Sequence, residues 1–421
     1  MDIKIMPGVL SGTVGAISSK SQAHRALICA ALAKENTYVK CESESRDIDA
    51  TALCLSALGA KVVREIDGYN VQPVNREEDD KIVTLPCGES GSTFRFMLPI
   101  VGALGRKASF TLEGRLPERP LSPLYEELLR HGCELSPQGS SPFFSRGQLL
   151  PGSYCLDAGV SSQFISGLLF ALPLLGEDSE LRLYGKAESF PYIELTLAMT
   201  EQFGVRYEFE NMVFYIRGSQ RYSSPGSIRV EGDWSNAAFW LASGAIGGDG
   251  ITCTGLDLRS RQGDRAILDI LSEFGANVMQ SDAEVTVRSA GLRGIEIDAQ
   301  DIPDLVPILS VVAVAAEGVT KIRNAGRLRD KESDRLAAVT SVLSGLGAKI
   351  SETSDGLVIY GGTGLAGGSA SSWGDHRIAM SAAIAATICT EPVHISNAEA
   401  VNKSYPGFFE DMSLLGGQVI M

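Results

Sequence analysis

The sequence gathers charged side chains into short stretches that stand just before apolar runs. The densest is DKESDRL, residues 330–336, in which five of seven residues carry charge. On a helix, Lys331, Glu332 and Arg335 would fall three or four residues apart, and as solvated pairs they would add only about 0.3–0.5 kcal/mol each. Two cations beside a carboxylate could equally bind an anionic ligand and transfer a proton. This stretch by itself allows both interpretations.

Similar polar stretches precede other apolar runs, and their residue types suit anions. Arginine binds carboxylate and phosphate through a planar fork, and lysine acts as a point charge. If these stretches begin helices, the free N–H groups and the partial positive charge of each helix start also attract anions. We therefore expect a local anion-binding site within an acidic chain. The residues concerned are Lys20, Ser21, Arg25, Gly91, Ser92, Arg95, Arg119, Ser161, Ser162, Gln163, Ser189, Tyr192, Asp304, Asp375, Arg377 and Lys403.

Most of these residues also have an ordinary structural explanation when taken singly. Ser21, Ser92 and Ser162 are good helix N-caps. Arg25 and Arg95 lie within apolar runs, where an unpaired guanidinium is costly, so each needs a ligand or a structural partner. The recurrence of polar residues at equivalent positions, rather than any one of them, favours a binding site.

A short pattern recurs six times along the chain and divides it into repeats. It consists of an apolar residue (once His), glycine, a small residue, a polar residue and a strand former, as in LGAKV, FGANV and LGAKI. The glycines follow amphipathic stretches such as AILDILSEFG, so each is expected to end a helix in the left-handed conformation. They are Gly59, Gly132, Gly204, Gly275, Gly347 and Gly416, at intervals of 69 to 73 residues.

Each repeat reads as strand, helix, strand, helix and hairpin. The first helix is apolar nearly all round, as in GSTFRFMLPIVGAL, and therefore belongs in a core. The last repeat ends after one hairpin strand, and the N-terminal segment DIKIMPG would supply the other. The sequence thus predicts an α/β fold, a two-domain inside-out α/β barrel of six βαβαββ repeats with buried helices, three per domain. Residues 1–18 and 228–421 would form one discontinuous domain and residues 19–227 the other.

Composition excludes several classes of protein. A net charge of −14 argues against a nucleic-acid binder, and no apolar run is long enough to cross a membrane. The N-terminus has no cationic segment followed by an apolar core, so we expect no signal peptide. Eight cysteines without a CxxC motif indicate reduced thiols and a cytoplasmic protein. Four scattered histidines predict no metal site.

Ten motifs, in order along the chain, resemble those of one enzyme family. They are SKSQAHRAL, GESGSTFRF, ERPLSPL, VSSQFISGLL, FPYIELT, VEGDWSNAAFWL, IPDLVP, DKESDRL, GDHRIAM and NKSYPGFFE. The set is similar to that of the 3-phosphoshikimate 1-carboxyvinyltransferases, also called 5-enolpyruvylshikimate-3-phosphate (EPSP) synthases. This resemblance spans the whole chain and implies two domains of three βαβαββ units. It also implies transfer of the enolpyruvyl group of phosphoenolpyruvate to the 5-hydroxyl of shikimate 3-phosphate, on the route to chorismate and the aromatic amino acids, without metal or cofactor.

The resemblance further implies roles for individual residues. The proton-transfer pair would be Asp304 and Glu332, with Lys20 assisting the departure of phosphate. Two positions depart from the family pattern, Glu89, where the commonest version has an amide, and Arg327, where many relatives have Asn, so their roles stay open. The implied phosphoenolpyruvate ligands are Lys20, Gly91, Arg119, Arg335, Arg377 and Lys403. The implied shikimate 3-phosphate ligands are Ser21, Arg25, Ser161, Ser162, Gln163, Ser189, Tyr192, Asp304 and Lys331.

Two other functions remain compatible with parts of the sequence. A UDP-N-acetylglucosamine enolpyruvyl transferase resembles the same fold, but that family uses a cysteine near the arginine equivalent to Arg119, and LEGRLPERPLSPL contains none. A non-catalytic phosphometabolite-binding protein would not need Asp304, Glu332 and Lys20 together. The expected partners are the two small substrates, with no nucleic acid and no membrane, and we expect a monomer.

Overall fold

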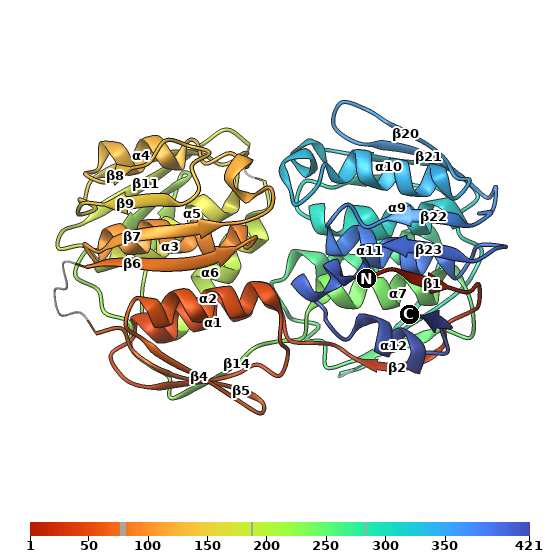
Figure 1. Cartoon of the computed structure of the whole chain (residues 1–421), viewed down its shortest axis with the longest axis horizontal. Coiled ribbons are helices and arrows are strands. Elements are labelled where there is room, and N and C mark those ends of the chain that lie inside the picture. The colour runs from red at the N-terminus through yellow and green to blue at the C-terminus, as the bar shows by residue number, and fades with distance from the viewer. Residues whose placement is uncertain (76–80, 187, 283) are drawn as a thin grey trace. The chain divides into compact units, whose positions relative to one another are not determined.

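The computed structural model describes residues 1–75, 81–186, 188–282 and 284–421 (Figure 1). By its internal contacts the chain divides into two units. Unit 1 comprises Met1–Ser19 and Glu231–Met421, and unit 2 comprises Lys20–Val230. The sequence analysis put the second crossing between units at residue 228. The structure puts it after Val230, because a strand at residues 227–229 pairs within unit 2.

Both units are built from one repeated supersecondary structure. Each repeat forms a four-stranded sheet in which the first two strands are parallel and the following neighbours are antiparallel. A parallel pair needs a crossover connection, which the first helix supplies in four of these six sheets, and the other two strands form a hairpin in five of them. Six such sheets make up the predicted two-domain inside-out α/β barrel.

Within its described residues, unit 2 contains three of these sheets and six α-helices. In spatial order the sheets are β14 (Ser227–Arg229), β3 (Thr37–Lys40), β5 (Gly68–Gln72) and β4 (Lys61–Glu65); β6 (Ile82–Gly88), β7 (Lys107–Leu112), β9 (Phe143–Arg146) and β8 (Glu134–Leu135); and β10 (Ser153–Asp157), β11 (Ser179–Tyr184), β13 (Val213–Ile216) and β12 (Glu208–Glu210). The helices are α1 (Lys20–Leu32), α2 (Arg46–Ala57), α3 (Gly91–Ala103), α4 (Leu124–Arg130), α5 (Ser162–Ala171) and α6 (Phe190–Gln202).

Unit 1 has the same content. Its sheets are β2 (Gly12–Gly15), β15 (Ile251–Thr254), β17 (Glu284–Arg288) and β16 (Asn277–Gln280); β18 (Glu296–Asp298), β19 (Gly318–Arg323), β21 (Leu357–Gly361) and β20 (Lys349–Glu352); and β22 (Gly368–Ser371), β23 (Val393–Ser396), β1 (Ile3–Ile5) and β24 (Val419–Ile420). Its helices are α7 (Trp234–Ile246), α8 (Ile267–Phe274), α9 (Val306–Ala315), α10 (Arg335–Gly345), α11 (His376–Ala386) and α12 (Phe408–Leu414).

The first helix of each repeat lies in the core of its unit, as its apolar sequence predicts. Nearly every side chain of α1, α3 and α5 is buried in unit 2, and the same holds for α7, α9 and α11 in unit 1. Small residues allow these helices to pack closely. A Cβ at Gly167 of α5 would lie 2.5 Å from the carbonyl oxygen of Arg95 in α3. The polar helix starts are therefore held on a rigid frame.

The second helix of each repeat ends at the glycine that marks the repeat in the sequence. All six glycines adopt the left-handed conformation, with φ between 80° for Gly204 and 105° for Gly347. A residue with a Cβ is strained there, whereas glycine is not. The prediction of six equivalent helix ends is confirmed.

Each segment that crosses between the units contains a short strand. This strand pairs with a sheet of the unit that the chain is leaving. In the chain, β2 directly precedes α1 of unit 2, yet it pairs with β15 of unit 1. Likewise β14 precedes α7 of unit 1 but pairs with β3 of unit 2. In the last repeat the N-terminal strand β1 lies between β23 and β24. Unit 2 is thus one continuous segment, and unit 1 is assembled from both ends of the chain.

Hydrogen bonds within unit 1 join the two crossing segments to each other. The Ser19 amide donates to the carbonyl of Glu231 at 2.8 Å. The buried side chain of Gln262 accepts a hydrogen bond from the Ser19 hydroxyl at 3.1 Å and donates to the carbonyl of Gly232 at 2.8 Å. One side chain therefore holds both segments.

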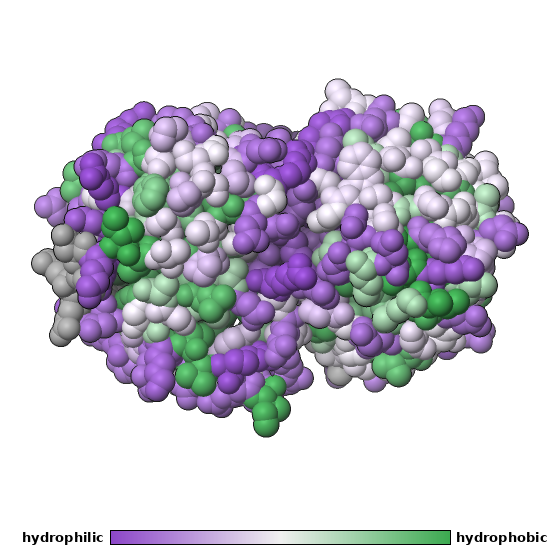
Figure 2. Space-filling model, viewed as in Figure 1, coloured by the Kyte–Doolittle hydropathy of each residue, from purple (hydrophilic) through white to green (hydrophobic). Residues whose placement is uncertain are grey.

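The surface is mainly hydrophilic. Figure 2 shows small, separated hydrophobic areas among hydrophilic residues on the visible face. Among the described residues, no helix combines the length and the apolar character needed to cross a bilayer. All eight cysteines are free thiols, and only Cys155 is exposed.

Candidate active site

In unit 1 the starts of three helices carry a charged cluster centred on Arg335, the first residue of α10, which is only 2% exposed. Its Nε donates to Asp375 at 2.7 Å, its Nη1 to Asp304 at 2.8 Å and its Nη2 to Glu332 at 2.8 Å. Burial alone would lower the pKa of Arg335, but the three carboxylates raise it above its usual range. We call these four residues, with Arg377, the Arg335 cluster.

Asp304 is placed between two guanidinium groups of this cluster. It belongs to the 3-10 helix that leads into α9. Its Oδ1 accepts from Arg335, and its Oδ2 accepts from Arg377 Nη2 at 2.9 Å. Burial would raise the pKa of Asp304, but Arg377, Arg335 and Lys331 outweigh this effect and hold the pKa well below its usual range. The carboxylate is therefore ionised at neutral pH.

Asp375 caps α11 and ties it to the loop before α10. Its Oδ1 accepts from the Arg377 amide at 2.9 Å, and its Oδ2 accepts from the Ser333 hydroxyl at 3.1 Å. An N-cap aspartate satisfies one of the free N–H groups of a helix start and suits its partial positive charge. Together with the Arg377–Asp304 contact, these bonds join the starts of α9, α10 and α11.

Asp264 is a further buried carboxylate that interacts with Asp304. It accepts a hydrogen bond from the Ser235 hydroxyl at the start of α7. Its pKa is raised to about 7, first by burial and then by the charge of Asp304, although Arg377 lowers it. Neighbouring carboxylates whose pKa values are pushed apart are typical of acid–base sites. The sequence analysis did not single out Asp264, and its only signal was the polar stretch RSRQGD before an outer helix.

The loop that carries Lys331 and Glu332 is held by Arg329. This guanidinium donates to Asp334 at 2.9 Å and to Glu352 at 2.8 Å, and Asp334 is the N-cap of α10. Because α10 starts only at Arg335, Lys331 and Glu332 lie in a loop rather than on a solvated helix face. Of the two interpretations of DKESDRL, the binding edge therefore fits the structure better.

In unit 2 the helix starts carry cations and hydroxyl groups. Lys20 is the first residue of α1, and its Nζ lies 2.9 Å from Asp47 Oδ2 in the first turn of α2. Both side chains are largely buried, so the ion pair is shielded from bulk water. Asp47 was missed by the sequence analysis. The signal that could have found it is an acidic residue two positions after the N-cap Ser45.

Arg25 meets oxygen acceptors of the protein inside the core. Its Nε donates to Thr196 Oγ1 at 2.8 Å, and its Nη2 donates to the carbonyl of Tyr192 at 2.8 Å. Burial lowers the pKa of Arg25 to about 10, which still leaves it cationic at neutral pH. The structural partner that the sequence required is therefore the start of α6.

Arg95 has a comparable arrangement between α3 and α5. Its Nη1 donates to Gln163 Oε1 at 2.7 Å, and Gln163 donates in turn to the Ser92 hydroxyl at 2.9 Å. Ser161 is the N-cap of α5 and accepts from the Gln163 amide at 3.3 Å. These contacts bring the starts of α3 and α5 together at one end of unit 2.

Gly91 opens α3 and allows the close approach of Arg119. A Cβ at Gly91 would lie 2.7 Å from Arg119 Nη1. Ser90 caps the helix by accepting from the Thr93 amide at 3.3 Å, which leaves the first amides of the helix available to an anion. The start of α3 thus presents backbone N–H groups beside a guanidinium.

The remaining predicted residues lie at other helix starts of their own units. Ser189 directly precedes α6 with φ 55°, a conformation that residues other than glycine rarely adopt and that is frequent at functional sites. Ser21, Ser162 and Tyr192 lie in the first turns of α1, α5 and α6. Lys403 ends a 3-10 helix in unit 1 and is buried.

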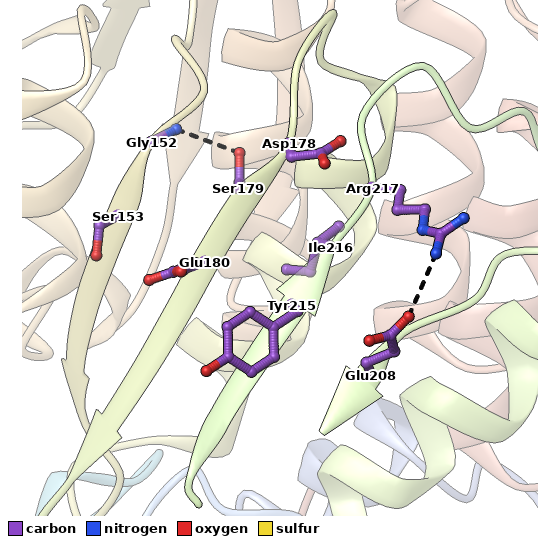
Figure 3. Close-up of a pocket in the computed structure, with 9 residues that line it drawn as sticks. All are labelled: Gly152, Ser153, Asp178, Ser179, Glu180, Glu208, Tyr215, Ile216 and Arg217. Atoms are coloured by element: carbon purple, nitrogen blue, oxygen red, sulfur yellow. Dashed lines mark hydrogen bonds and ion pairs between the residues drawn. The ribbon is translucent and has the colours of Figure 1, made fainter. Parts of the chain in front are cut away.

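A pocket of about 470 Å³ in unit 2 lies apart from these helix starts (Figure 3). It opens where β10 and β11 begin, whereas α5 starts beyond the other end of β10. Its charged groups already have partners, since Glu208 pairs with Arg217 at 3.5 Å and Asp178 accepts from the Gly218 amide at 2.9 Å. Among the described residues, no group of three or more His, Cys, Asp or Glu side chains could hold a metal ion. The pocket is lined by Gly152, Ser153, Asp178, Ser179, Glu180, Glu208, Tyr215, Ile216 and Arg217.

Comparison with known proteins relates the whole chain to one family. Residues 6–412 match the family described as EPSP synthase (3-phosphoshikimate 1-carboxyvinyltransferase). A 3-phosphoshikimate 1-carboxyvinyltransferase from Clostridium kluyveri is 42% identical over 419 residues, which cover 99% of this chain and 98% of that protein. One from Clostridium perfringens is 43% identical over 416 residues, which cover 98% of each protein. Among solved structures, EPSP synthase from Acinetobacter baumannii has a TM-score of 0.81 at 25% identity and is covered over 100% of both chains.

Proposed function

Since this chain belongs to the EPSP synthase family, the 3-phosphoshikimate 1-carboxyvinyltransferases, we propose how its two units share the work of that reaction. The protein is a transferase that moves the enolpyruvyl group of phosphoenolpyruvate to the 5-hydroxyl of shikimate 3-phosphate and releases phosphate, in aromatic amino-acid biosynthesis. In this proposal the transfer runs by addition and elimination through a tetrahedral intermediate. The main support for assigning proton transfer to unit 1 is the Arg335 cluster. In it, both proposed proton-transfer residues, Asp304 and Glu332, bond to one buried guanidinium.

Unit 1 supplies the proton-transfer pair. Asp304 removes the proton of the attacking hydroxyl. Glu332, in its protonated form, delivers its proton to the methylene carbon of phosphoenolpyruvate and takes one back as phosphate leaves. With both its oxygens bonded to Arg335 and Arg377, Asp304 is a weak base. The carboxylate of phosphoenolpyruvate competes for the same guanidinium groups. Substrate binding therefore frees Asp304 and raises its pKa toward the range in which a carboxylate is an effective base.

Lys331, Arg377 and Lys403 add positive charge to unit 1. Lys331 and Arg377 both act on the pKa of Asp304, which indicates that their charges lie close to it. In this proposal Arg335, Arg377 and Lys403 bind phosphoenolpyruvate, and Lys331 binds shikimate 3-phosphate beside Asp304. Arg335 must then exchange at least one of its carboxylate partners for the ligand.

Unit 2 supplies the binding groups that lie at its helix starts. The phosphate of phosphoenolpyruvate binds at the start of α3, where Gly91 and Arg119 meet, and Lys20 assists its departure. This role is supported by the contact distance at Gly91 and by the free N–H groups of a helix start. The phosphate and hydroxyls of shikimate 3-phosphate bind to a second set at α1, α5 and α6. This set is Ser21, Arg25, Ser161, Ser162, Gln163, Ser189 and Tyr192.

We further infer that the protein acts as a monomer in the cytoplasm. Its exposed large hydrophobic side chains within the described residues are distributed along the chain, from Met1 to Met421, rather than over one element. Its free thiols suit a reducing compartment. Light scattering on the eluted protein should give a mass near 44.8 kDa. Twice that mass at micromolar concentration would contradict the monomer.

The decisive experiment is phosphate release by the purified protein given phosphoenolpyruvate with each of two acceptors. Release with shikimate 3-phosphate, and none with UDP-N-acetylglucosamine, is the expected result. Release with UDP-N-acetylglucosamine alone would show that the acceptor is the nucleotide sugar, while enolpyruvyl transfer would remain the reaction. Tight binding of shikimate 3-phosphate without release under any condition would favour a non-catalytic binding protein.

A further inference from the structure

Two rungs of side-chain contacts fasten α1 to α2, one helical turn apart. The outer rung is the ion pair of Lys20 and Asp47. The inner rung joins His24 Nδ1 to Thr51 Oγ1 at 2.7 Å. Each helix contributes residues four positions apart, so both rungs lie on the same pair of facing helix surfaces. The inner rung lies in the core, because His24 and Thr51 are 0% exposed.

The inner rung continues into α3. Thr51 Oγ1 lies 2.7 Å from Thr93 Oγ1, and the Thr93 hydroxyl donates to Ser90 Oγ at 2.7 Å. Ser90 is the N-cap of α3 and directly precedes Gly91. One chain of four buried side chains therefore connects a core histidine to the helix start that is proposed to bind a phosphate group.

The hydrogen-bond directions in this chain depend on one another. A hydroxyl has a single proton, so Thr93, which donates to Ser90, must accept from Thr51, and Thr51 must in turn accept from His24. His24 then carries its proton on Nδ1. Its Nε2 has no hydrogen-bond partner among the described residues, which a nitrogen without a proton tolerates better than a buried N–H group. Burial also lowers the pKa of His24 to about 3, so the ring is neutral.

We propose that His24 is a positioning residue for phosphoenolpyruvate, acting through Thr51 and Thr93 on the start of α3 and through its own helix on Lys20. This inference rests on the proposed function, in which Gly91 and Lys20 bind that substrate. We call His24, Thr51 and Thr93 the relay. None of these side chains needs to touch substrate, because they set where the amides at the start of α3 lie relative to the ammonium group of Lys20. Loss of the inner rung lets the start of α3 shift against α1 and weakens this subsite most.

The shikimate 3-phosphate residues provide an internal reference. Arg25, next to His24 in the sequence, is held separately by Thr196 and Tyr192 of α6. Those contacts do not pass through Thr51 or Thr93. Gln163 does contact Ser92 of α3, so a break in the relay should raise the KM for phosphoenolpyruvate more than the KM for shikimate 3-phosphate.

The test is Thr51→Val, which removes the central hydroxyl and keeps the side-chain shape. We expect the KM for phosphoenolpyruvate to rise roughly fivefold to tenfold, the effect of losing about one buried hydrogen bond, with kcat and the other KM little changed. Thr51→Ser restores the hydroxyl and should return the KM to its wild-type value. Thr200→Val is the matched control, since Thr200 is equally buried in unit 2 and its hydroxyl donates to backbone carbonyls of α6 rather than to Thr51 or Thr93.

The imidazole ¹⁵N spectrum of His24 tests the donor direction independently of turnover. A neutral ring protonated on Nδ1, unchanged from pH 5.5 to 8.5, is expected, and an Nε2–H ring would overturn the relay. Equal KM values for Thr51→Val and Thr200→Val, or a shift in the shikimate 3-phosphate KM instead, would also overturn it. A wild-type protein without turnover would refute the assigned reaction, and the spectrum would still decide whether the donor chain exists.

Discussion

One guanidinium, that of Arg335, is bonded to three carboxylates within the core of unit 1. Removing one partner of a buried charged group usually costs more than the pair contributes, because the other charge is left without compensation. A ligand that brings its own carboxylate and phosphate avoids this cost, since it replaces the partners it displaces. The cluster is therefore stable as it stands and can still exchange partners during the reaction.

Asp304→Asn tests the base at the scale of one atom. The substitution keeps the shape of the side chain and removes its ability to take a proton, so kcat should fall by about 10²–10⁴-fold. Glu332→Gln should have a comparable effect on kcat. Phosphate release under saturating substrates measures both. Asp249→Asn, at an exposed turn of unit 1, controls for the loss of one negative charge. An Asp304→Asn enzyme with wild-type kcat would remove Asp304 from the mechanism.

His24 predicts a particular dependence of stability on pH. Its pKa is about 3 in the folded protein, against 6.5 for an unperturbed histidine, because burial outweighs the raising effect of Asp47, while Lys20 and Arg25 lower it further. Between these two values the unfolded chain binds a proton that the folded chain does not. Stability should therefore fall as pH drops below 6.5, by up to about 1.4 kcal/mol per pH unit from this group.

Urea unfolding at pH 7, 6 and 5 measures this contribution. The wild type should lose more free energy of unfolding between pH 6 and pH 5 than His24→Asn, which has no imidazole to protonate. His394→Asn is the control, since His394 is exposed on β23. Identical pH slopes for the wild type and His24→Asn would show that His24 is not buried as a neutral ring.

Sequence reasoning predicted candidate site residues from the recurrence of polar residues before apolar runs. Lys20 and Arg377 were visible because cations at helix starts are conspicuous in the sequence. Asp47 and Asp264 were missed, because an acidic residue early in a helix is also what any surface helix would have. The competition of three carboxylates for Arg335 could not be read from spacing, since Asp304 lies 31 residues before Arg335 and Asp375 belongs to the next repeat.

At the scale of elements, the glycine that ends the second helix of each repeat sets the direction of the hairpin after it. It lets the chain reverse directly from the helix into the hairpin, and this is why the same five-residue pattern recurs six times. The prediction of the βαβαββ repeat rested on these glycines and was confirmed. The pattern is local, so it needs no knowledge of tertiary contacts.

Gly275→Ala should destabilise unit 1 by about 1–2 kcal/mol, the cost of a left-handed residue with a Cβ. Gly275 has φ 103°, and its Cβ would lie 2.9 Å from the carbonyl oxygen of Gly291. Denaturant unfolding measures the loss. Gly8→Ala is the matched control, because its Cβ would meet nothing within 4 Å and its φ is not in the left-handed region. Equal stability of the two variants would contradict the role of the cap.

The placement of β2 and β14 could not be predicted in the same way. Both are short, GTVG and SIR, and carry no clear alternation of apolar and polar residues. Chain order assigns each to the helix that follows it, whereas the structure pairs each with a sheet of the unit it leaves. The sheet with a free edge is determined only when the repeats assemble. No single stretch of sequence therefore predicts the partner of either strand.

At the scale of the whole molecule, unit 2 is complete within one continuous segment. The fragment 20–230 contains all three of its sheets, including β14 beside β3. We expect this fragment to fold by itself and to unfold cooperatively in circular dichroism. The fragment 20–226 lacks β14 and leaves β3 at an open edge, so it should be less stable and more prone to aggregate. Equal behaviour of the two fragments would show that β14 contributes little to unit 2.

The pairing of β1 has a consequence for biosynthesis. Its partners are β23 and β24, with Ile3 opposite Ile395, so almost the whole polypeptide must leave the ribosome before the first strand can pair. Unit 2 can meanwhile fold during translation, because none of its sheets waits for residues beyond Val230. Strand β1 is synthesised long before its partners and is then among the last segments to become ordered. Until then β1 and its partners remain unpaired. Unpaired strand edges are prone to aggregate, and chaperones shield such nascent segments.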